Sequence, residues 1–277
     1  MSGLEIFHSF PEAVTAGMMM AVTCSFLGVF VVLKRLVFIG ATLSEVAACG
    51  IAASLYYQVN PFWGAIAFTM AAVTLLAVSQ EEYRIPRDSI MAVLFVLASC
   101  LAILFVAKSS FGLEEVKSFL YGDLILTSSA DLRILSMSVV PVTLLIFFFR
   151  RPVIYTFLDQ DEAKVLGIKT RFWELCFYYA MGIVISAASK LGGMLLVFCY
   201  LVVPPIAGLI LSNRLFLAVA LSVLLSIVST LAGFYISYQY DLPTNQVIGV
   251  TACFFLALIF VSKSLLQFIS RAAVAAK

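Results

Sequence analysis

Few side chains in this hydrophobic sequence could do chemistry, and the first candidates are Glu45 and Cys49, which lie in a long apolar stretch. They stand one helical turn apart, so they share one face of a helix. A carboxylate at membrane depth costs roughly 2.5–3.5 kcal/mol on insertion scales, so it usually faces a polar cavity or a partner. Two interpretations are open: Glu45 contacts a cation in a translocation path, or a protonated Glu45 is hydrogen-bonded between helices.

Ser44 is the neighbour of Glu45 and belongs to a stripe of small residues with Gly40 and Ala48. Such a stripe permits close packing of two membrane helices. Ser44 is therefore a candidate for the wall of the same path.

A second acidic candidate is Asp123, in the segment 119–131. This segment is too polar to span a membrane and too apolar for a free loop, so we expect a helix and turn packed at the outer mouth. Asp123 could attract cations there, or it could cap the segment after Gly122.

Two adjacent prolines, Pro204 and Pro205, lie inside the apolar segment 192–212. They remove two backbone donors, so they predict a kink or break in the helix. In transporters such breaks can expose carbonyls to a cavity. A kink with a purely structural role fits the same pattern.

The polar stretch 150–171 contains one predicted short helix, 156–167, which Thr156 could N-cap and Gly167 could end. Acidic residues favour its N-terminal half, Lys164 lies nearer its C-terminus, and its apolar side is formed by three residues. The acidic residues are Asp159, Asp161 and Glu162, and the apolar ones are Phe157, Ala163 and Leu166. Such a helix could lie on the lipid surface or form the docking element for a soluble partner protein.

The elements that must position these residues are membrane-spanning helices. The chain of 277 residues is 63% hydrophobic and 12% charged, with a mean hydropathy of +1.11, and one soluble core cannot hide so much apolar surface. We expect an all-α, polytopic bundle that forms a single membrane domain over residues 1–277. Nine helices are predicted, over 12–33, 37–58, 61–80, 88–107, 132–149, 172–189, 192–212, 215–238 and 244–262. Around residues 190–193, the two predicted helices 172–189 and 192–212 could equally be one bent region.

Charge predicts the orientation of the bundle. If Lys34 and Arg35 are cytoplasmic and the helices alternate, only four of the 17 Lys and Arg residues fall outside: Lys108, Lys117, Arg133 and Lys190. The positive-inside rule then places the N-terminus outside and the C-terminus in the cytoplasm. The formal net charge of +2 suggests no nucleic-acid partner, and the six cysteines, all in apolar stretches, are expected to be packing residues. No cleavable signal peptide is expected, because acidic residues and no basic ones precede the first apolar run.

Four segments, in this order, resemble the permease subunits of the zinc/manganese/iron class of bacterial ABC importers over nearly the whole chain. The first runs from Lys34-Arg35 through Phe38, Gly40, Leu43 and Ser44 to Gly50, and the second is Tyr121-Gly122-Asp123-Leu124-Ile125. The third consists of Asp159, Asp161, Ala163 and Gly167, and the fourth of Gly193, Leu195, Leu196, Val197 and Pro204.

This resemblance implies a type II importer-like fold and a set of partners. These are a second permease (the same chain or a sister chain), two cytoplasmic ATPase subunits and an extracytoplasmic metal-binding protein. The helix 156–167 would then be the coupling helix seated on the ATPase. The permease itself would hydrolyse nothing and bind no cofactor, with ATP acting through the partner, and the chain has no Gly-x-x-x-x-Gly-Lys-Ser/Thr loop.

The sequence departs from the family at its usual metal-ligand pair. Ala41 and Glu45 stand where the family has Asp and His, and Cys49 replaces a proline. Glu45 and Cys49 could form a shifted pair of ligands, or the ion could pass with little coordination here, or a sister chain could supply ligands. The single histidine, His8, precedes the first helix and is expected to be a surface residue, which disfavours a histidine-rich zinc path.

Two alternatives to a divalent-metal importer permease remain. One is a permease of the same architecture for an organic metal chelate, such as a siderophore or corrinoid. The other is an intramembrane enzyme, for which the spans contain no His-Asp, Ser-His or acidic pair.

Overall fold

The structure, a computed structural model, describes residues 10–78, 87–108, 122–158 and 160–275. In this part of the chain every regular element is a helix. In chain order they are α2 (Pro11–Leu33), α3 (Val37–Tyr56), α4 (Pro61–Val78), α5 (Arg87–Lys108), the 3₁₀ helix η1 (Leu124–Leu126), α7 (Ser129–Phe148), α8 (Arg150–Leu158), α9 (Gln160–Val165), α10 (Thr170–Leu211), α11 (Leu215–Tyr240) and α12 (Thr244–Ala275). His8, Tyr121 and Asp159 lie outside the described residues.

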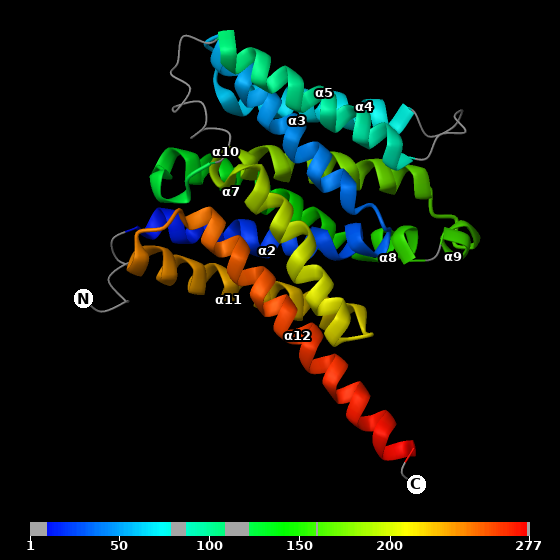
Figure 1. The fold of residues 1–277 in the computed structure, drawn as a ribbon. Coiled ribbons are helices and arrows are strands. Elements are labelled where there is room, and N and C mark those ends of the chain that lie inside the picture. The colour runs from blue at the N-terminus through cyan, green and yellow to red at the C-terminus, as the bar shows by residue number, and fades with distance from the viewer. Residues whose placement is uncertain (1–9, 79–86, 109–121, 159, 276–277) are drawn as a thin grey trace.

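The bundle is built around α2, α3 and α10. The most apolar windows of α2 and α3 are 67% and 83% buried, whereas those of α5 and α12 are 17% buried. Figure 1 shows α3, α4 and α5 together on one side of α10, with α2, α7 and α11 on the other. The outer helices therefore present apolar surface outward, as expected where lipid replaces water as the solvent.

Helix α10 consists of two arms that reverse direction at Gly193. This glycine is the one residue within the helix with non-helical backbone angles, φ 67° and ψ 170°. The contacts with α2 show the reversal. Glu174 pairs with Lys34 near the end of α2, Gly192 lies against Met20, and Leu201 then lies against Gly28. The chain thus runs down α2 and back along it, and Figure 1 shows the two arms diverging from this point.

The break in this region lies at Gly193, and the helix does not break at Pro204 and Pro205, where a kink or break had been predicted. Both prolines lie within continuous helix. A proline at position i frees the carbonyl at i−4, and α2 meets both freed carbonyls. Ser25 Oγ donates to the Tyr200 carbonyl at 3.4 Å. The Leu201 carbonyl is so close to Gly28 that a Cβ there would lie 2.2 Å from its oxygen.

The predicted number of membrane helices is approximately consistent with the structure. Among the described residues, seven helices are long and apolar enough to span a membrane, and α4 is a shorter apolar helix. At 1.5 Å per residue, the 42 residues of α10 are about twice as long as a bilayer core is thick, so its arms are two passes. The predicted segments 172–189 and 192–212 are these two arms, joined by one residue rather than by a loop.

Gly28 provides a test of the close approach between α2 and α10. In Gly28→Ala the new methyl group would meet the Leu201 carbonyl and the ring of Pro205, and overpacking of this kind costs about 1–3 kcal/mol. We expect a lower melting temperature in detergent. Gly249→Ala in α12 is the matched control, since nothing lies within 4 Å of its added Cβ. Equal melting temperatures for the two variants would contradict the proposed packing.

Candidate functional site

Glu45 is buried between α3 and α5, with 7% of its surface exposed. Ser99 Oγ of α5 donates a hydrogen bond to Glu45 Oε1, whereas Oε2 has no hydrogen-bond partner among the described residues. The neighbouring Ser44 Oγ is also buried without one. An unpaired buried polar atom costs about 1–3 kcal/mol. Glu45 therefore makes the expected hydrogen bond between helices, and one of its oxygens remains available for another ligand.

Cys49 lies one turn beyond Glu45 and is 1% exposed. It lines an apolar pocket of about 570 Å³ between α3, α4 and α5, whose wall does not include Glu45. Among the described residues no group of three or more His, Cys, Asp and Glu side chains could hold a metal ion. The described part of the chain therefore brings no other such side chains to Glu45 and Cys49 to complete a group of three.

Asp123 has the capping role that was one of its two predicted roles. Its Oδ1 accepts a hydrogen bond of 3.0 Å from the Ile125 backbone N–H, which caps η1, and its side chain is exposed. The preceding Gly122 has φ +66° and packs directly on the break in α10. A Cβ at Gly122 would lie 2.3 Å from the Gly193 nitrogen, so only glycine fits there.

The sequence did not single out Asn245, which joins these two segments. Its Nδ2 donates to the carbonyls of Gly122 and Gly192, each at 3.0 Å. The segment before η1, the break in α10 and the first turn of α12 therefore meet at one side chain. The sequence signal that could have identified Asn245 is its polar amide in the first turn of an apolar span, because a buried polar group needs hydrogen-bond partners.

At the opposite end, Phe157 fixes the α8–α9 segment to the bundle. Its ring lies 4.5 Å from that of Phe177 and 6.1 Å from that of Phe30, measured between centroids, and Lys34 Nζ lies 5.2 Å from its centroid. Lys34 also lies 3.9 Å from Glu174 Oε1. Phe157 is 6% exposed, so it anchors the segment and is not part of a surface for a partner.

The predicted single helix 156–167 is two helices, and the N-cap assignment was wrong. Helix α8 begins at Arg150, directly after α7, so Thr156 lies inside α8 and not at its N-terminus. The side chain of Thr156 is buried. Gly167 does end α9: it has φ +71°, and the Ile168 N–H donates to the Ala163 carbonyl at 2.9 Å. Such a bond across a left-handed glycine is the Schellman arrangement.

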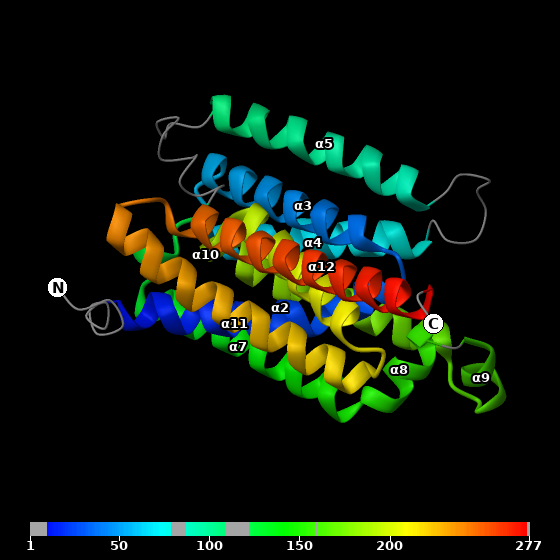
Figure 2. The same ribbon diagram turned by 60° about the horizontal axis from the view of Figure 1, so that its bottom comes forward.

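The exposed apolar side of α9 differs from the predicted one. Val165 and Leu166 are 88% and 57% exposed, whereas Ala163 is fully buried. Glu162 is exposed as well, and the side chains of Asp161 and Lys164 lie outside the described part of the structure. The predicted apolar side did not include Val165, because the prediction assumed one continuous helix over 156–167 with Phe157 on the same face. Figure 2 shows α9 projecting beyond the ends of the long helices.

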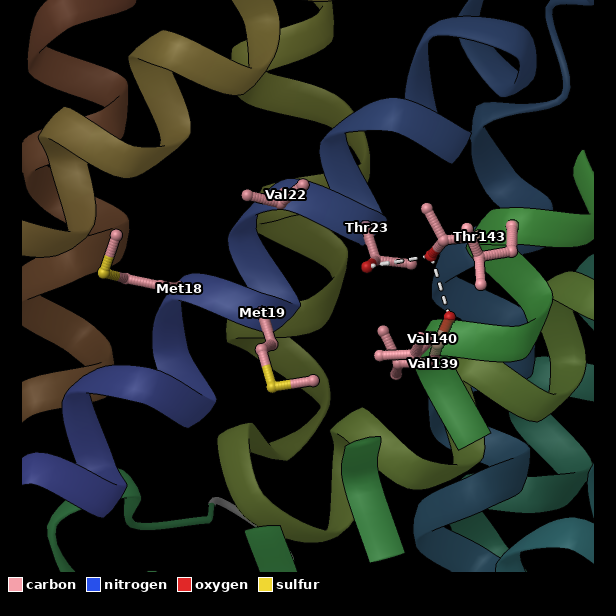
Figure 3. Close-up of a pocket in the computed structure, with 8 residues that line it drawn as sticks. Met18, Met19, Val22, Thr23, Val139, Val140 and Thr143 are labelled. Atoms are coloured by element: carbon pink, nitrogen blue, oxygen red, sulfur yellow. Dashed lines mark hydrogen bonds between the residues drawn. The ribbon is translucent and has the colours of Figure 1, made fainter. Parts of the chain in front are cut away.

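A smaller pocket of about 330 Å³ lies between α2 and α7, and none of the described residues that line it is charged. Figure 3 shows Thr23 and Thr143 joined by a hydrogen bond of 3.3 Å, while Thr143 also donates to the Val139 carbonyl. Met18 and Met19 point away from this pair and from each other. Since Thr143 donates to Val139, Thr23 is the donor to Thr143. Both hydroxyl groups therefore have a hydrogen-bond acceptor among the described residues.

The structure is a polytopic helical bundle with a short, anchored helix pair projecting from one end, an arrangement compatible with a membrane transport subunit. Residues 7–263 match the ABC 3 transport family, and the chain belongs to that family. A relative in Buchnera aphidicola, a high-affinity zinc uptake system membrane protein, is 25% identical over 87% of this chain and 93% of its own. A manganese transport system membrane protein of Listeria innocua is 25% identical over 97% of this chain and 96% of its own.

The fold is also that of a solved structure. The chain superposes on one from PsaBC of Streptococcus pneumoniae in complex with Fab with a TM-score of 0.83, covering 93% of this chain and 94% of the other. Because the sequence identity is 19%, this similarity supports the fold, that is, the arrangement of the helices, and nothing more. The predicted all-α membrane bundle and the predicted family are therefore confirmed.

Phe157→Ala is expected to release α8 and α9 from the bundle. Loss of a buried Phe costs about 3–5 kcal/mol, here concentrated on contacts with Phe30 and Phe177. We expect faster cleavage by trypsin within 150–171 and a lower melting temperature. Phe172→Ala is the control, because Phe172 is 57% exposed. Unchanged cleavage in Phe157→Ala would show that other contacts hold the segment.

Proposed function

We propose that this chain is the permease subunit of an ATP-driven importer that carries a divalent metal ion (zinc, manganese or iron) into the cytoplasm. The observation that carries the proposal is the exposed apolar tip of α9, Val165 and Leu166, held on the bundle by Phe157. Membership of the ABC 3 transport family supports it. The curated relatives are named for zinc and manganese, which favours a metal ion over an organic chelate.

The partners follow from this role. Two permeases, either two copies or this chain with a sister chain, would associate with two cytoplasmic ATPase subunits and an extracytoplasmic metal-binding protein. The α8–α9 pair is the proposed coupling segment, with Val165, Leu166 and Glu162 facing the ATPase and Phe157 and Ala163 facing the permease. Asp159, Asp161 and Gly167 belong to the same segment. ATP would be hydrolysed by the partner, and the permease would contribute movement.

The proposed location is the bacterial inner membrane, with the N-terminus outside and the C-terminus in the cytoplasm. The positive-inside pattern supports this orientation. Lys34 lies against Phe157 of α8, so the cations at the end of α2 and at the start of α8 lie at the same end of the bundle. Lys190, at the other end, is neutralised by Asp131 at 2.6 Å.

The proposed path for the ion passes Glu45, with Ser44 and Cys49 beside it and Asp123 at the outer mouth. The carboxylate oxygen of Glu45 that has no described partner is the strongest candidate ligand. A transported ion must be released, so few ligands suit a carrier better than a tight cage does.

Leu166→Asp tests the coupling segment without disturbing the bundle, because Leu166 is exposed. A charge at the tip should abolish metal uptake and co-purification with the ATPase while the melting temperature is unchanged. Leu166→Ala, which shortens the contact without adding charge, should keep partial activity. Ala163→Asp should instead unfold the segment, since Ala163 is fully buried. Normal uptake and an intact complex in Leu166→Asp would refute the coupling role.

Glu45→Gln removes the charge but keeps an oxygen that can accept from Ser99. We expect uptake of radioactive Zn, Mn and Fe into vesicles containing the full complex to fall about tenfold at low metal concentration. Competition among the three metals in the same vesicles identifies the cargo. Ser99→Ala is the control, since it leaves the carboxylate in place. Wild-type uptake by Glu45→Gln at all metal concentrations would remove Glu45 from the path.

A further inference from the structure

An apolar groove runs along α11 on the outside of the bundle, and the end of α7 together with α8 forms its other wall. Helices α7 and α11 both pack against α2 and make little contact with one another. Helix α2 forms the floor of the groove with Phe26 and Phe30. The groove has a volume of about 580 Å³. Several of its lining side chains are open to the surroundings, and Phe216 is 79% exposed.

One end of this groove is cationic. Arg150, at the start of α8, is its one charged lining residue. Its guanidinium carbon lies 5.5 Å from the centroid of Phe147, and no carboxylate of the described residues forms an ion pair with it. Arg214, which is exposed, directly precedes the lining residue Leu215 at the start of α11. In Figure 2 the start of α11 lies close to the junction of α7 and α8.

The dimensions of the groove match one leaflet of a bilayer. Its α11 wall extends from Leu215 to Ile227, which is about 18 Å at 1.5 Å per residue, and half of a bilayer core is about 15 Å. An apolar α11 wall about one leaflet long, beside an arginine that forms no ion pair among the described residues, fits an acyl chain with a negatively charged headgroup.

We propose that this groove binds an anionic phospholipid, with one acyl chain along α11 against the α7–α8 junction and its phosphate at Arg150 and Arg214. The lipid would fill the space that α7 and α11 leave open, and it would brace the α7–α8 junction from which the coupling segment extends. The proposal depends on the proposed function only in assigning the groove to the cytoplasmic leaflet.

The test uses the full chain in nanodiscs that contain equal amounts of phosphatidylglycerol and phosphatidylcholine. Native mass spectrometry after release into detergent should show retained phosphatidylglycerol. Removing each arginine, as Arg150→Gln and Arg214→Gln, should weaken retention about fivefold, since each cation near an anionic surface contributes about that factor. Arg133→Gln is the control, because Arg133 is also exposed but lies at the other end of α7.

A second pair of variants tests the apolar walls. Ala220 lines the groove, so Ala220→Phe should exclude the acyl chain and abolish lipid retention. Leu217→Phe, also on α11 and 49% exposed but outside the groove, should have no effect. Equal retention of both lipids, or unchanged retention in Arg150→Gln and Ala220→Phe, would overturn the proposal.

The groove could instead be a contact between permeases, and the same variants separate the two. If Ala220→Phe breaks the permease dimer in cross-linking while lipid retention is unchanged, the lipid proposal is wrong. Because retention is measured without metal or ATP, its failure leaves the importer proposal intact. Accessibility of a cysteine placed at Arg214 to impermeant reagents checks the leaflet separately.

Discussion

Gly193 holds a left-handed backbone conformation, and at this residue the two arms of α10 turn back against α2. A residue with a Cβ would be strained at φ 67°, and the chain reverses there without a loop. The reversal places Glu174 at one end of α2 and Leu201 beside Gly28. The other helices then pack around α2 and the two arms of α10, so this geometry decides where α3, α7 and α11 can lie.

In lipid, backbone groups released by such features must find partners within the protein. Short side chains from neighbouring helices supply them. Ser25 donates to the Tyr200 carbonyl, which Pro204 frees, and Asn245 donates to the Gly122 and Gly192 carbonyls beside Gly193. Ser226 adds a bond at 3.0 Å to the Ala21 carbonyl within the regular helix α2. The Tyr200 hydroxyl in turn meets Thr230 at 2.6 Å. Individual bonds of this kind contribute modestly, about 0.6 kcal/mol on average, so their main effect is to define one register between helices.

The two ends of the bundle are joined through the same helices. At one end Lys34 of α2 and Phe177 of α10 hold Phe157 of the α8–α9 segment. At the other end Gly122 and Asn245 contact the point where α10 reverses. A movement imposed on α8 would therefore act first on α2 and α10, the helices that also carry the reversal. This continuity gives a physical basis for the transmission of movement that the proposed coupling role of α8 and α9 requires.

The sequence by itself determined that the chain is an all-α membrane bundle, because hydropathy and helix length are local properties that lipid enforces. It also determined the family, through four short segments in order, and the end of α9 at Gly167, because a helix stop depends on nearby residues. Only the tertiary structure decided that the break lies at Gly193, since Ser25 and Gly28 lie far from the prolines in sequence. It likewise decided that Phe157 and Ala163 face inward while Val165 faces outward, and that Glu45 meets Ser99. Each of these depends on which distant helix packs alongside, and periodicity within one segment does not contain that information.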